Sequence, residues 1–149
     1  MCAIIGAAGK IPPRGTIERA RDTMAHRGPD GSGIYYSEKE GVALGHRRLS
    51  IIDLSSAGKQ PFCSNDGRFV IVFNGEIYNY PELKKELAHK YDFKTKTDTE
   101  VLLASYITWG EKCLQKLNGM FAFAIWDTKE RKLFCARDRL GEKPLFYFF

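Results

Sequence analysis

The stretch Phe69-Val70-Ile71-Val72-Phe73 is a continuous apolar run, and Asn74-Gly75 follows it directly. Unbroken runs of β-branched and aromatic residues that end at turn residues are typical of buried strands. Asn-Gly is a common turn pair, so we expect the strand to stop at Asn74. Glu76 then leads back to apolar residues, which is unusual after a plain turn. The run therefore predicts a central strand with polar side chains at its end.

Shorter apolar runs on both sides of this strand predict further strands. Two of them lie on either side of the polar residues 127–131, which favours a hairpin. The expected strands cover residues 2–7, 34–36, 42–44, 121–126, 133–136 and 145–149.

Helices are predicted by capping residues that precede apolar positions with helical spacing. Thr16 can cap a helix that ends before Gly28, and Asn79 one that runs from about Pro81 to His89. Thr97 and Glu100 form a capping box for a helix that continues to Trp109, and a shorter helix is expected over residues 113–117. Because strands and helices occur in groups, the pattern favours an α+β fold with antiparallel sheets, and a sheet sandwich flanked by helices is one solution.

Length and composition limit the classes of protein. The 149 residues suit one domain, and 44% hydrophobic residues provide a core. Apolar runs are too short to cross a bilayer, and no signal peptide is visible. The net charge of +5 is spread evenly along the chain, so we expect neither a nucleic-acid nor a membrane partner. Four well-separated cysteines predict free thiols in the cytoplasm and no metal site.

Cys2 is a candidate nucleophile because of its position in the chain. Removal of Met1 would give residue 2 a free α-amino group, whose pKa of about 7.7–8.0 suits a general base. Thiol and base would then belong to one residue, as in N-terminal nucleophiles. The alternative is a small buried cysteine on an edge strand.

Further polar residues could complete such a site. Asn74 and the backbone N–H of Gly75 could bind an oxyanion, although they could equally form a turn. Arg48 could clamp a carboxylate, and Glu76 with Asp98 could bind an ammonium group. Each also has a plain explanation as a surface or capping charge. Together these residues favour an enzyme that hydrolyses an amino-acid amide.

Seven motifs in this order resemble the N-terminal glutaminase domain of glutamine-hydrolysing asparagine synthetases, which are class II glutamine amidotransferases. The resemblance covers essentially all 149 residues. The motifs are Met1-Cys2, His26-Arg27-Gly28-Pro29-Asp30-Gly31, His46-Arg47-Arg48-Leu49-Ser50-Ile51-Ile52-Asp53, Asn74-Gly75-Glu76-Ile77-Tyr78-Asn79, Asp98-Thr99-Glu100, Gly119-Met120-Phe121-Ala122-Phe123-Ala124 and the stretch from Arg137 to Leu145.

The resemblance implies a four-layer sandwich of two antiparallel sheets between helical layers, as in N-terminal-nucleophile hydrolases. It implies that Cys2 attacks the side-chain amide of L-glutamine and forms a thioester, while Asn74 and Gly75 form the oxyanion hole. Arg48 would hold the α-carboxylate of glutamine. Glu76 and Asp98 would hold its α-ammonium group. Backbone groups of Leu49, Ser50, Ile51 and Ile52 would line the pocket.

The resemblance also implies a partner. In the family, ammonia passes to a C-terminal synthetase domain that uses ATP and magnesium, whereas the glutaminase domain needs no cofactor. We expect residues 1–149 to be a fragment of a longer chain, because the sequence ends on aromatic residues, and the full protein could form a homodimer. A separate glutaminase subunit is the alternative. The family most often has Gly where this chain has Ala3.

Three other functions remain open at this stage. The same glutaminase could serve another ammonia acceptor, as in glucosamine-6-phosphate synthase or amidophosphoribosyltransferase. An N-terminal-nucleophile acylase or peptidase would share the chemistry of Cys2. A basic binding module without enzymatic activity would show binding to nucleic acid that depends steeply on salt.

Overall fold

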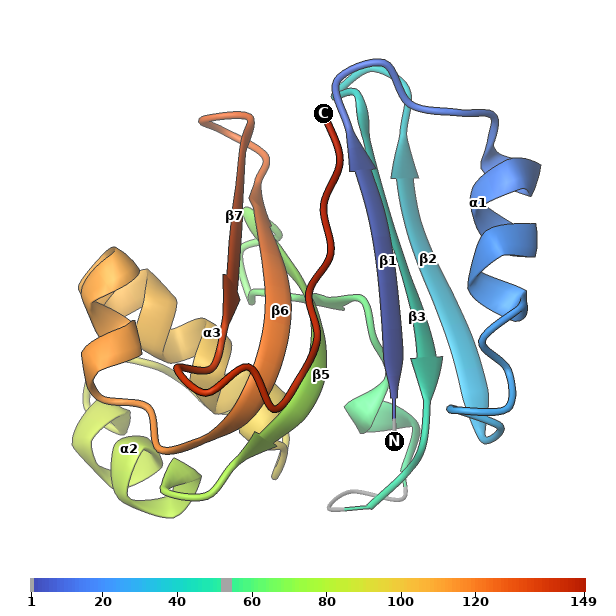
Figure 1. The fold of residues 1–149 in the computed structure, drawn as a ribbon. Coiled ribbons are helices and arrows are strands. Elements are labelled where there is room, and N and C mark those ends of the chain that lie inside the picture. The colour runs from blue at the N-terminus through green and yellow to red at the C-terminus, as the bar shows by residue number, and fades with distance from the viewer. Residues whose placement is uncertain (1, 52–54) are drawn as a thin grey trace.

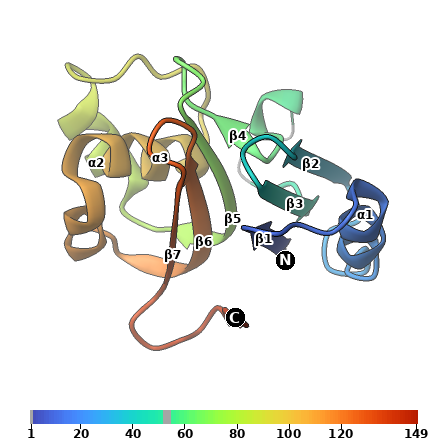
Figure 2. The ribbon, with the colours of Figure 1, turned by 90° about the horizontal axis from the view of Figure 1, so that it is seen from above.

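Two antiparallel sheets face each other in the computed structural model, which describes residues 2–51 and 55–149. Helices α2 (Tyr80–Leu87) and α3 (Asp98–Trp109) cover the outer face of one sheet, and helix α1 (Arg14–Asp22) covers the outer face of the other (Figures 1 and 2). The four layers are thus helices, sheet, sheet and helix. The predicted four-layer α+β sandwich is confirmed.

The first sheet has the strand order β1-β3-β2. Its strands are β1 (Ala3–Ala8), β2 (Gly31–Ser37) and β3 (Val42–Arg48), and α1 (Arg14–Asp22) connects β1 to β2. Strands β1 and β3 are paired so that Ala3 lies opposite Arg47. The residue after the N-terminal methionine and the end of β3 are therefore neighbours at one end of the sandwich (Figure 1).

The second sheet has the order β4-β5-β6-β7. Its strands are β4 (Phe62–Cys63), β5 (Phe69–Ile77), β6 (Gly119–Asp127) and β7 (Lys132–Arg137). Two α-helices and two 3₁₀ helices complete the described elements: α2 (Tyr80–Leu87), α3 (Asp98–Trp109), η1 (Ser56–Gly58) and η2 (Gly110–Gln115). None of the helices in the described ranges is long and apolar enough to span a membrane.

The alternation of side chains along β5 builds two hydrophobic cores. Phe69, Ile71 and Phe73 pack in the core beneath α2 and α3, whereas Val70 and Val72 belong to the core between the sheets. Burial on both faces explains the continuous apolar run, because a strand with one solvated face would alternate with polar residues. The same alternation directs Asn74, two residues after Val72, towards the first sheet.

The prediction that Asn74-Gly75 ends the strand is wrong. Strand β5 continues to Ile77, and Asn74 and Gly75 lie opposite Ala122 and Phe121 of β6. A Cβ atom on Gly75 would lie 2.2 Å from the carbonyl oxygen of Met120. Glycine is therefore present because the two strands approach closely, and not because the chain turns.

The predicted helix starts have mixed outcomes. The Thr97 side chain accepts a hydrogen bond from the backbone N–H of Glu100, as expected for the cap of α3. By contrast, α1 begins at Arg14, so Thr16 lies inside its first turn. Pro13 precedes the first turn, where its fixed φ suits a helix start. Asn79 flanks α2, but its side chain bonds backbone groups of Lys116 and Asn118 instead.

The strand expected over residues 145–149 is also absent. This segment has no regular secondary structure, and the side chains of its aromatic residues are almost fully exposed. No described strand pairs with it, so its apolar sequence alone does not produce a strand. The short strand β4 was not expected, because two residues carry no detectable periodicity.

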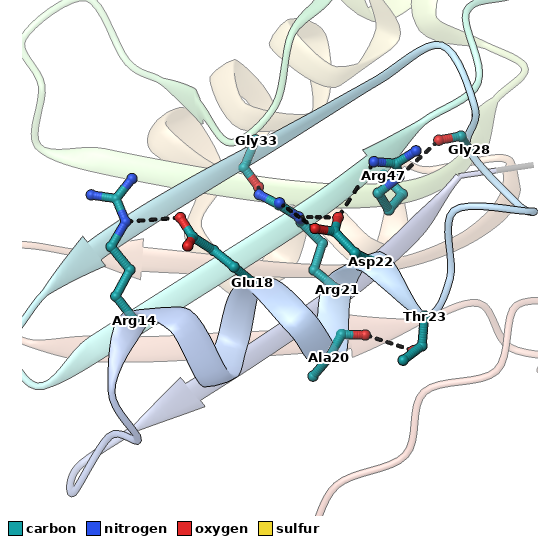
Figure 3. A network of polar contacts seen from close by, with 9 residues as sticks. All are labelled: Arg14, Glu18, Ala20, Arg21, Asp22, Thr23, Gly28, Gly33 and Arg47. Atoms are coloured by element: carbon teal, nitrogen blue, oxygen red, sulfur yellow. Dashed lines mark hydrogen bonds and ion pairs between the residues drawn. The ribbon is translucent and has the colours of Figure 1, made fainter.

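A network of ion pairs fastens α1 to the first sheet (Figure 3). Arg21 contacts both carboxylate oxygens of Asp22 at 2.9 Å. Arg47 lies 3.4 Å from the same carboxylate and donates to the carbonyl of Gly28 at 3.0 Å. The network therefore fixes the end of β3, where Arg48 begins the functional site.

Candidate active site

One pocket lies where the two sheets meet at the start of β1, and we call it the Cys2 pocket. The first sheet and the chain after β3 contribute Cys2, Arg48, Leu49 and Ile51. The second sheet and α3 contribute Asn74, Gly75, Glu76 and Asp98. Cys2 and Asp98, which lie 96 positions apart in the sequence, thus share one cavity.

Strand periodicity explains why these side chains converge. Val42 and Leu44 of β3 point into the core between the sheets, so Arg48 lies on the same face of its strand. Ile4 packs against that core too, which places Cys2 on the inward face of the chain entering β1. Asn74 continues the inward face of β5. The pocket is therefore the polar end of the apolar layer between the sheets.

The sulfur of Cys2 is oriented by the backbone of Leu49. The Leu49 N–H lies 3.4 Å from Sγ, and the thiol lies 3.6 Å from the Leu49 carbonyl oxygen. These two contacts fix the direction in which the sulfur points. Leu49 thus holds the candidate nucleophile at the pocket wall.

Asp30 supports the backbone around Leu49 from outside the pocket. Its N–H donates to the carbonyl of Arg48 at 3.0 Å, and its carboxylate accepts the Ser50 N–H at 2.8 Å. A Cβ atom on Gly28 would lie 2.4 Å from the carbonyl carbon of Arg47. Gly28 and Asp30 of the His26–Gly31 motif therefore pack against the end of β3 and hold the backbone that forms the pocket wall.

Successive backbone groups on the open edge of β5 have different partners. Because Phe69 bonds Ser64 next to β4, every second residue from Phe69 onward faces away from β6. The Phe73 N–H donates to Gln60 Oε1 at 2.6 Å, and the Ile77 N–H to Asp98 Oδ2 at 3.1 Å.

Gly75 lies between these two anchored donors on the same edge. Its N–H therefore faces the pocket side of the strand and has no protein partner among the described contacts. An unpaired backbone N–H at a pocket wall is a ready donor for a developing negative charge.

The side-chain amide of Asn74 is oriented towards the same pocket. Its Oδ1 is buried and has no hydrogen-bond partner within the described part of the chain. Its Nδ2 is not buried in this way, so the amide presents its N–H groups to the cavity that Asn74 lines. A buried acceptor without a partner destabilises a fold by about 1–3 kcal/mol. This orientation of the Asn74 amide therefore lowers the stability of the fold but leaves its N–H groups available to a ligand.

Asp98 carries an unusual carboxyl group. It is almost completely buried, and burial raises its pKa to about 6, assisted by the nearby Glu76. Hydrogen bonds from the backbone N–H groups of Ile77 and Thr99 oppose this rise. Glu76 is half-buried on the same wall. Two acidic side chains in one pocket make a suitable environment for an ammonium group.

The pocket also holds a cationic residue at its other side. Arg48 Nη1 donates to the Ser55 carbonyl oxygen at 2.7 Å, which fixes the direction of the guanidinium. Arginine can clamp a carboxylate through two parallel hydrogen bonds. Opposite charges at Arg48 and Asp98 therefore match the two charged groups of a free α-amino acid.

Most residues predicted for the site line this pocket, with two exceptions. Ser50 lines a neighbouring surface depression with Asp30 and Lys59, while its N–H is used by Asp30. Ile52 lies outside the described residues. The sequence reasoning missed further pocket residues, which are Gly58, Gln60, Phe73, Thr97, Thr99 and Met120.

The Thr97 capping box was visible in the sequence, but nothing in its pattern indicated a pocket wall. Gln60 lies in a loop without periodicity, so no signal could have marked it. Within residues 2–51 and 55–149, no three His, Cys, Asp or Glu side chains are grouped as a metal ion would require.

The chain is similar to known proteins in sequence and in fold. The sequence profile of the family described as "Glutamine amidotransferase domain" matches residues 1–148. Asparagine synthetase [glutamine-hydrolyzing] 3 of Bacillus subtilis is 46% identical over 99% of this chain. Putative asparagine synthetase [glutamine-hydrolyzing] 2 of Methanocaldococcus jannaschii is 42% identical over the same share. The chain covers 25% and 32% of these two relatives.

A solved structure shares the fold. The glutamine phosphoribosylpyrophosphate amidotransferase of B. subtilis, complexed with ADP and GMP, superposes with a TM-score of 0.76. The match covers 93% of this chain and 37% of that chain at 22% identity. The similarity supports the sandwich architecture.

Proposed function

Because this chain belongs to the glutamine amidotransferase domain family, we propose that it hydrolyses the side-chain amide of L-glutamine to glutamate and ammonia. The observation that carries the proposal is the Cys2 pocket, in which a cysteine, an asparagine amide, the backbone of Gly75 and opposite charges line one cavity. An acyl-transfer enzyme specific for a free amino acid needs these groups together.

The first step is attack by Cys2 Sγ on the amide carbon of glutamine. In the mature protein Met1 has been removed, and the α-amino group of Cys2 accepts the thiol proton. The same group then gives a proton to the departing nitrogen, which leaves as ammonia. Sulfur and carbonyl carbon form the new bond, and the C–N bond breaks. The product is a γ-glutamyl thioester on Cys2.

Negative charge develops on the amide oxygen during this attack. The side-chain N–H of Asn74 and the backbone N–H of Gly75 stabilise it, because both donors face the pocket and have no acceptor among the described residues. Donors that are already in place require no reorganisation during the reaction. Water then attacks the thioester, the same donors bind the second oxyanion, and glutamate leaves.

The charged ends of the pocket select glutamine. Arg48 binds the α-carboxylate, and Glu76 with Asp98 binds the α-ammonium group. Leu49, Ser50, Ile51 and Ile52 contribute backbone to the same wall. The raised pKa of Asp98 fits this assignment, because the buried carboxylate lacks a positive partner among the described residues and a bound ammonium group would stabilise its ionised form.

The ammonia acceptor is proposed from the relatives. Their printed names are glutamine-hydrolysing asparagine synthetases, so we assign the released ammonia to asparagine formation from aspartate. A C-terminal synthetase domain or subunit would carry that reaction with ATP and magnesium, and the protein could act as a homodimer. The glutaminase step itself uses no cofactor. Its thiols, which form no disulfide among the described residues, suit the cytoplasm.

The glutaminase activity is tested by measuring ammonia and glutamate from glutamine, using protein whose N-terminus has been defined by mass. We expect equal amounts of both products. Two truncated substrates serve as controls: 4-carbamoylbutanoate lacks the amine, and 4-aminobutanamide lacks the carboxylate. Equal rates with all three amides would support an acylase instead. Full activity with Met1 retained would contradict the role of the α-amino group.

The acceptor is tested separately, on the protein purified from its natural source. Addition of aspartate, ATP and magnesium should convert released ammonia to asparagine. Glutamine hydrolysis without asparagine would indicate another acceptor and leave the glutaminase assignment intact.

A further inference from the structure

His46 is a buried polar residue that the proposed chemistry does not use. It lies on β3 on the same strand face as Leu44 and Arg48, in the layer between the two sheets, and it has no exposed surface. Its Nε2 lies 3.2 Å from the carbonyl oxygen of Phe73. A carbonyl oxygen only accepts, so Nε2 carries the proton and donates.

Neither charge nor packing explains a histidine at this position. Burial lowers the pKa of the ring to about 4, so His46 is neutral near pH 7. The other ring nitrogen, Nδ1, then accepts only, and it has no hydrogen-bond partner among the described residues. An aliphatic side chain would fill the same space without a buried, unpaired acceptor, and such an acceptor lowers stability. The hydrogen bond to the Phe73 carbonyl is therefore the remaining explanation for a histidine at position 46.

The backbone N–H and carbonyl of Phe73 need hydrogen-bond partners, because the pairing of β4 with β5 does not extend to Phe73. The short strand β4 pairs only with Val70 and Ile71, so no described strand borders this edge of β5 from Phe73 onward. His46 binds the carbonyl of Phe73, and Gln60 accepts its N–H at 2.6 Å. Gln60 also donates to Thr99 Oγ1 at 3.2 Å and so connects this point to α3.

The Phe73 carbonyl belongs to the peptide unit that continues into Asn74. Peptide units are planar, so holding this oxygen fixes the backbone nitrogen of Asn74 and the direction in which the strand enters Gly75. The two residues that bind the oxyanion therefore follow directly after a carbonyl held by the opposite sheet.

We propose that His46 is a positioning residue for glutamine hydrolysis, acting through the Phe73 carbonyl to hold Asn74 and Gly75 in the geometry that binds the oxyanion. This inference rests on the proposed function. A displacement of about 1 Å in a catalytic group can reduce the rate about 100-fold. Loss of the bond should therefore reduce kcat, whereas Arg48, Glu76 and Asp98 should still bind glutamine.

Three variants separate positioning from packing. His46→Leu keeps an apolar side chain in the layer but removes the donor. His46→Gln keeps an N–H at a similar reach. Leu44→Ala, on the same face of the same strand, removes a fully buried core side chain and serves as the matched stability control. Thermal melts should show a loss of stability for Leu44→Ala, and they give the folded fraction of His46→Leu.

The kinetic readout is kcat and KM for glutamine. His46→Leu should lose roughly 10- to 100-fold in kcat with KM little changed, as expected for an interaction that matters in the transition state. His46→Gln should recover most of kcat, and Leu44→Ala should retain it. Equal kcat for His46→Leu and Leu44→Ala, after allowance for the folded fraction, would overturn the proposal. Failure of His46→Gln to recover activity would do so too.

A second readout reports on the oxyanion site itself. The aldehyde analogue of glutamine, in which –CHO replaces the side-chain amide, forms a hemithioacetal with Cys2 whose oxygen occupies the oxyanion site. His46→Leu should weaken its inhibition by the same factor as kcat, while glutamine binding measured in a Cys2→Ala background stays constant. If His46→Leu does not fold, His46→Asn, whose amide is too short to reach Phe73, replaces it with the same expectations.

The two possible failures are distinguishable. If the unmodified protein releases no ammonia from glutamine, the proposed function fails. If it does release ammonia but His46→Leu behaves like Leu44→Ala, only the role of His46 fails.

Discussion

Two clusters of charged residues lie at opposite faces of the first sheet, and the pKa of the aspartate in each is shifted in the opposite direction. In the network around α1, Asp22 is bound by Arg21 and Arg47 (Figure 3). The hydrogen bond from Arg21 holds the pKa of Asp22 below its ordinary value. In the Cys2 pocket, burial raises the pKa of Asp98 to about 6, with Glu76 beside it.

The other polar groups follow the same division. Around α1, Arg21, Asp22 and Arg47 all have hydrogen-bond partners. In the pocket, the Asn74 Oδ1 and the Gly75 N–H lack protein partners among the described residues. The first cluster holds two elements together. The second keeps its binding groups available, which lowers stability but prepares the site for a ligand.

The largest expected effect is loss of the nucleophile. Cys2→Ala should reduce glutamine hydrolysis by a factor on the order of 10⁶, as removal of a catalytic nucleophile typically does. The charged groups of the pocket remain, so isothermal calorimetry should still detect glutamine binding. Loss of binding together with activity would show that Cys2 supports the pocket structurally.

Removal of one oxyanion donor should have the next largest effect. Asn74→Ala should raise the barrier of the chemical step by about 2.7–4 kcal/mol, as loss of such a donor does elsewhere. Because the variant also removes a buried unpaired oxygen, its thermal stability should not fall in proportion. Steady-state kinetics check this: unchanged kcat with a higher KM would assign Asn74 to substrate binding.

The two aspartates offer a matched pair of stability variants. In the folded state the pKa of Asp98 is about 6, above its ordinary value of 3.8. The carboxyl group therefore has no effect on the free energy of unfolding below about pH 4, where it is protonated in both states. Above about pH 6 its ionisation destabilises the folded state fully. Asp98→Asn should thus raise unfolding free energy at pH 8 by up to about 3 kcal/mol, the equivalent of a two-unit shift. At pH 3.5 the gain should vanish.

Asp22→Asn should change stability in the opposite direction. Its lowered pKa means that the ionised form stabilises the fold above pH 4 and that this contribution disappears as the pH falls through the folded pKa. The variant should melt slightly below the parent at pH 8 with unchanged kcat. Melting curves of both variants at both pH values test the comparison, and equal signs at pH 8 would break it.

The smallest effect concerns pH and substrate affinity. Asp98 loses its charge as the pH falls through about 6, so the KM for glutamine should rise there, while 4-carbamoylbutanoate, which has no amine, should show no such change. KM measured from pH 5 to 8 for both substrates checks this. A parallel rise for both would exclude a direct contact between Asp98 and the ammonium group.

The sequence predicted much of the fold because its signals are local. The buried run Phe69–Phe73 and the capping residue Thr97 depend on neighbours in the chain, and both are found in the structure. Asn74-Gly75 was misread because the close approach of β6 is a long-range contact, whereas turn propensity considers only the sequence pair. The apolar segment 145–149 was misread because a strand needs a partner.

The candidate site shows the same limit. Cys2, Asn74 and Asp98 could be chosen as chemically suitable, but their convergence depends on how the two sheets face each other. The sequence assigns no role to Gln60 or to His46, because their contacts with Phe73 join residues 13 and 27 positions apart. Pairings of this kind become visible only in three dimensions.

The central claim is that Cys2 attacks the side-chain amide of glutamine in this pocket. The direct measurement is mass spectrometry of protein that is acid-quenched during turnover and then digested. We predict a γ-glutamyl group on the peptide that begins with Cys2, in amounts that follow the rate of ammonia release. Ammonia release with an unmodified Cys2, or a glutamyl group on Cys63 or Cys135 instead, would contradict the account.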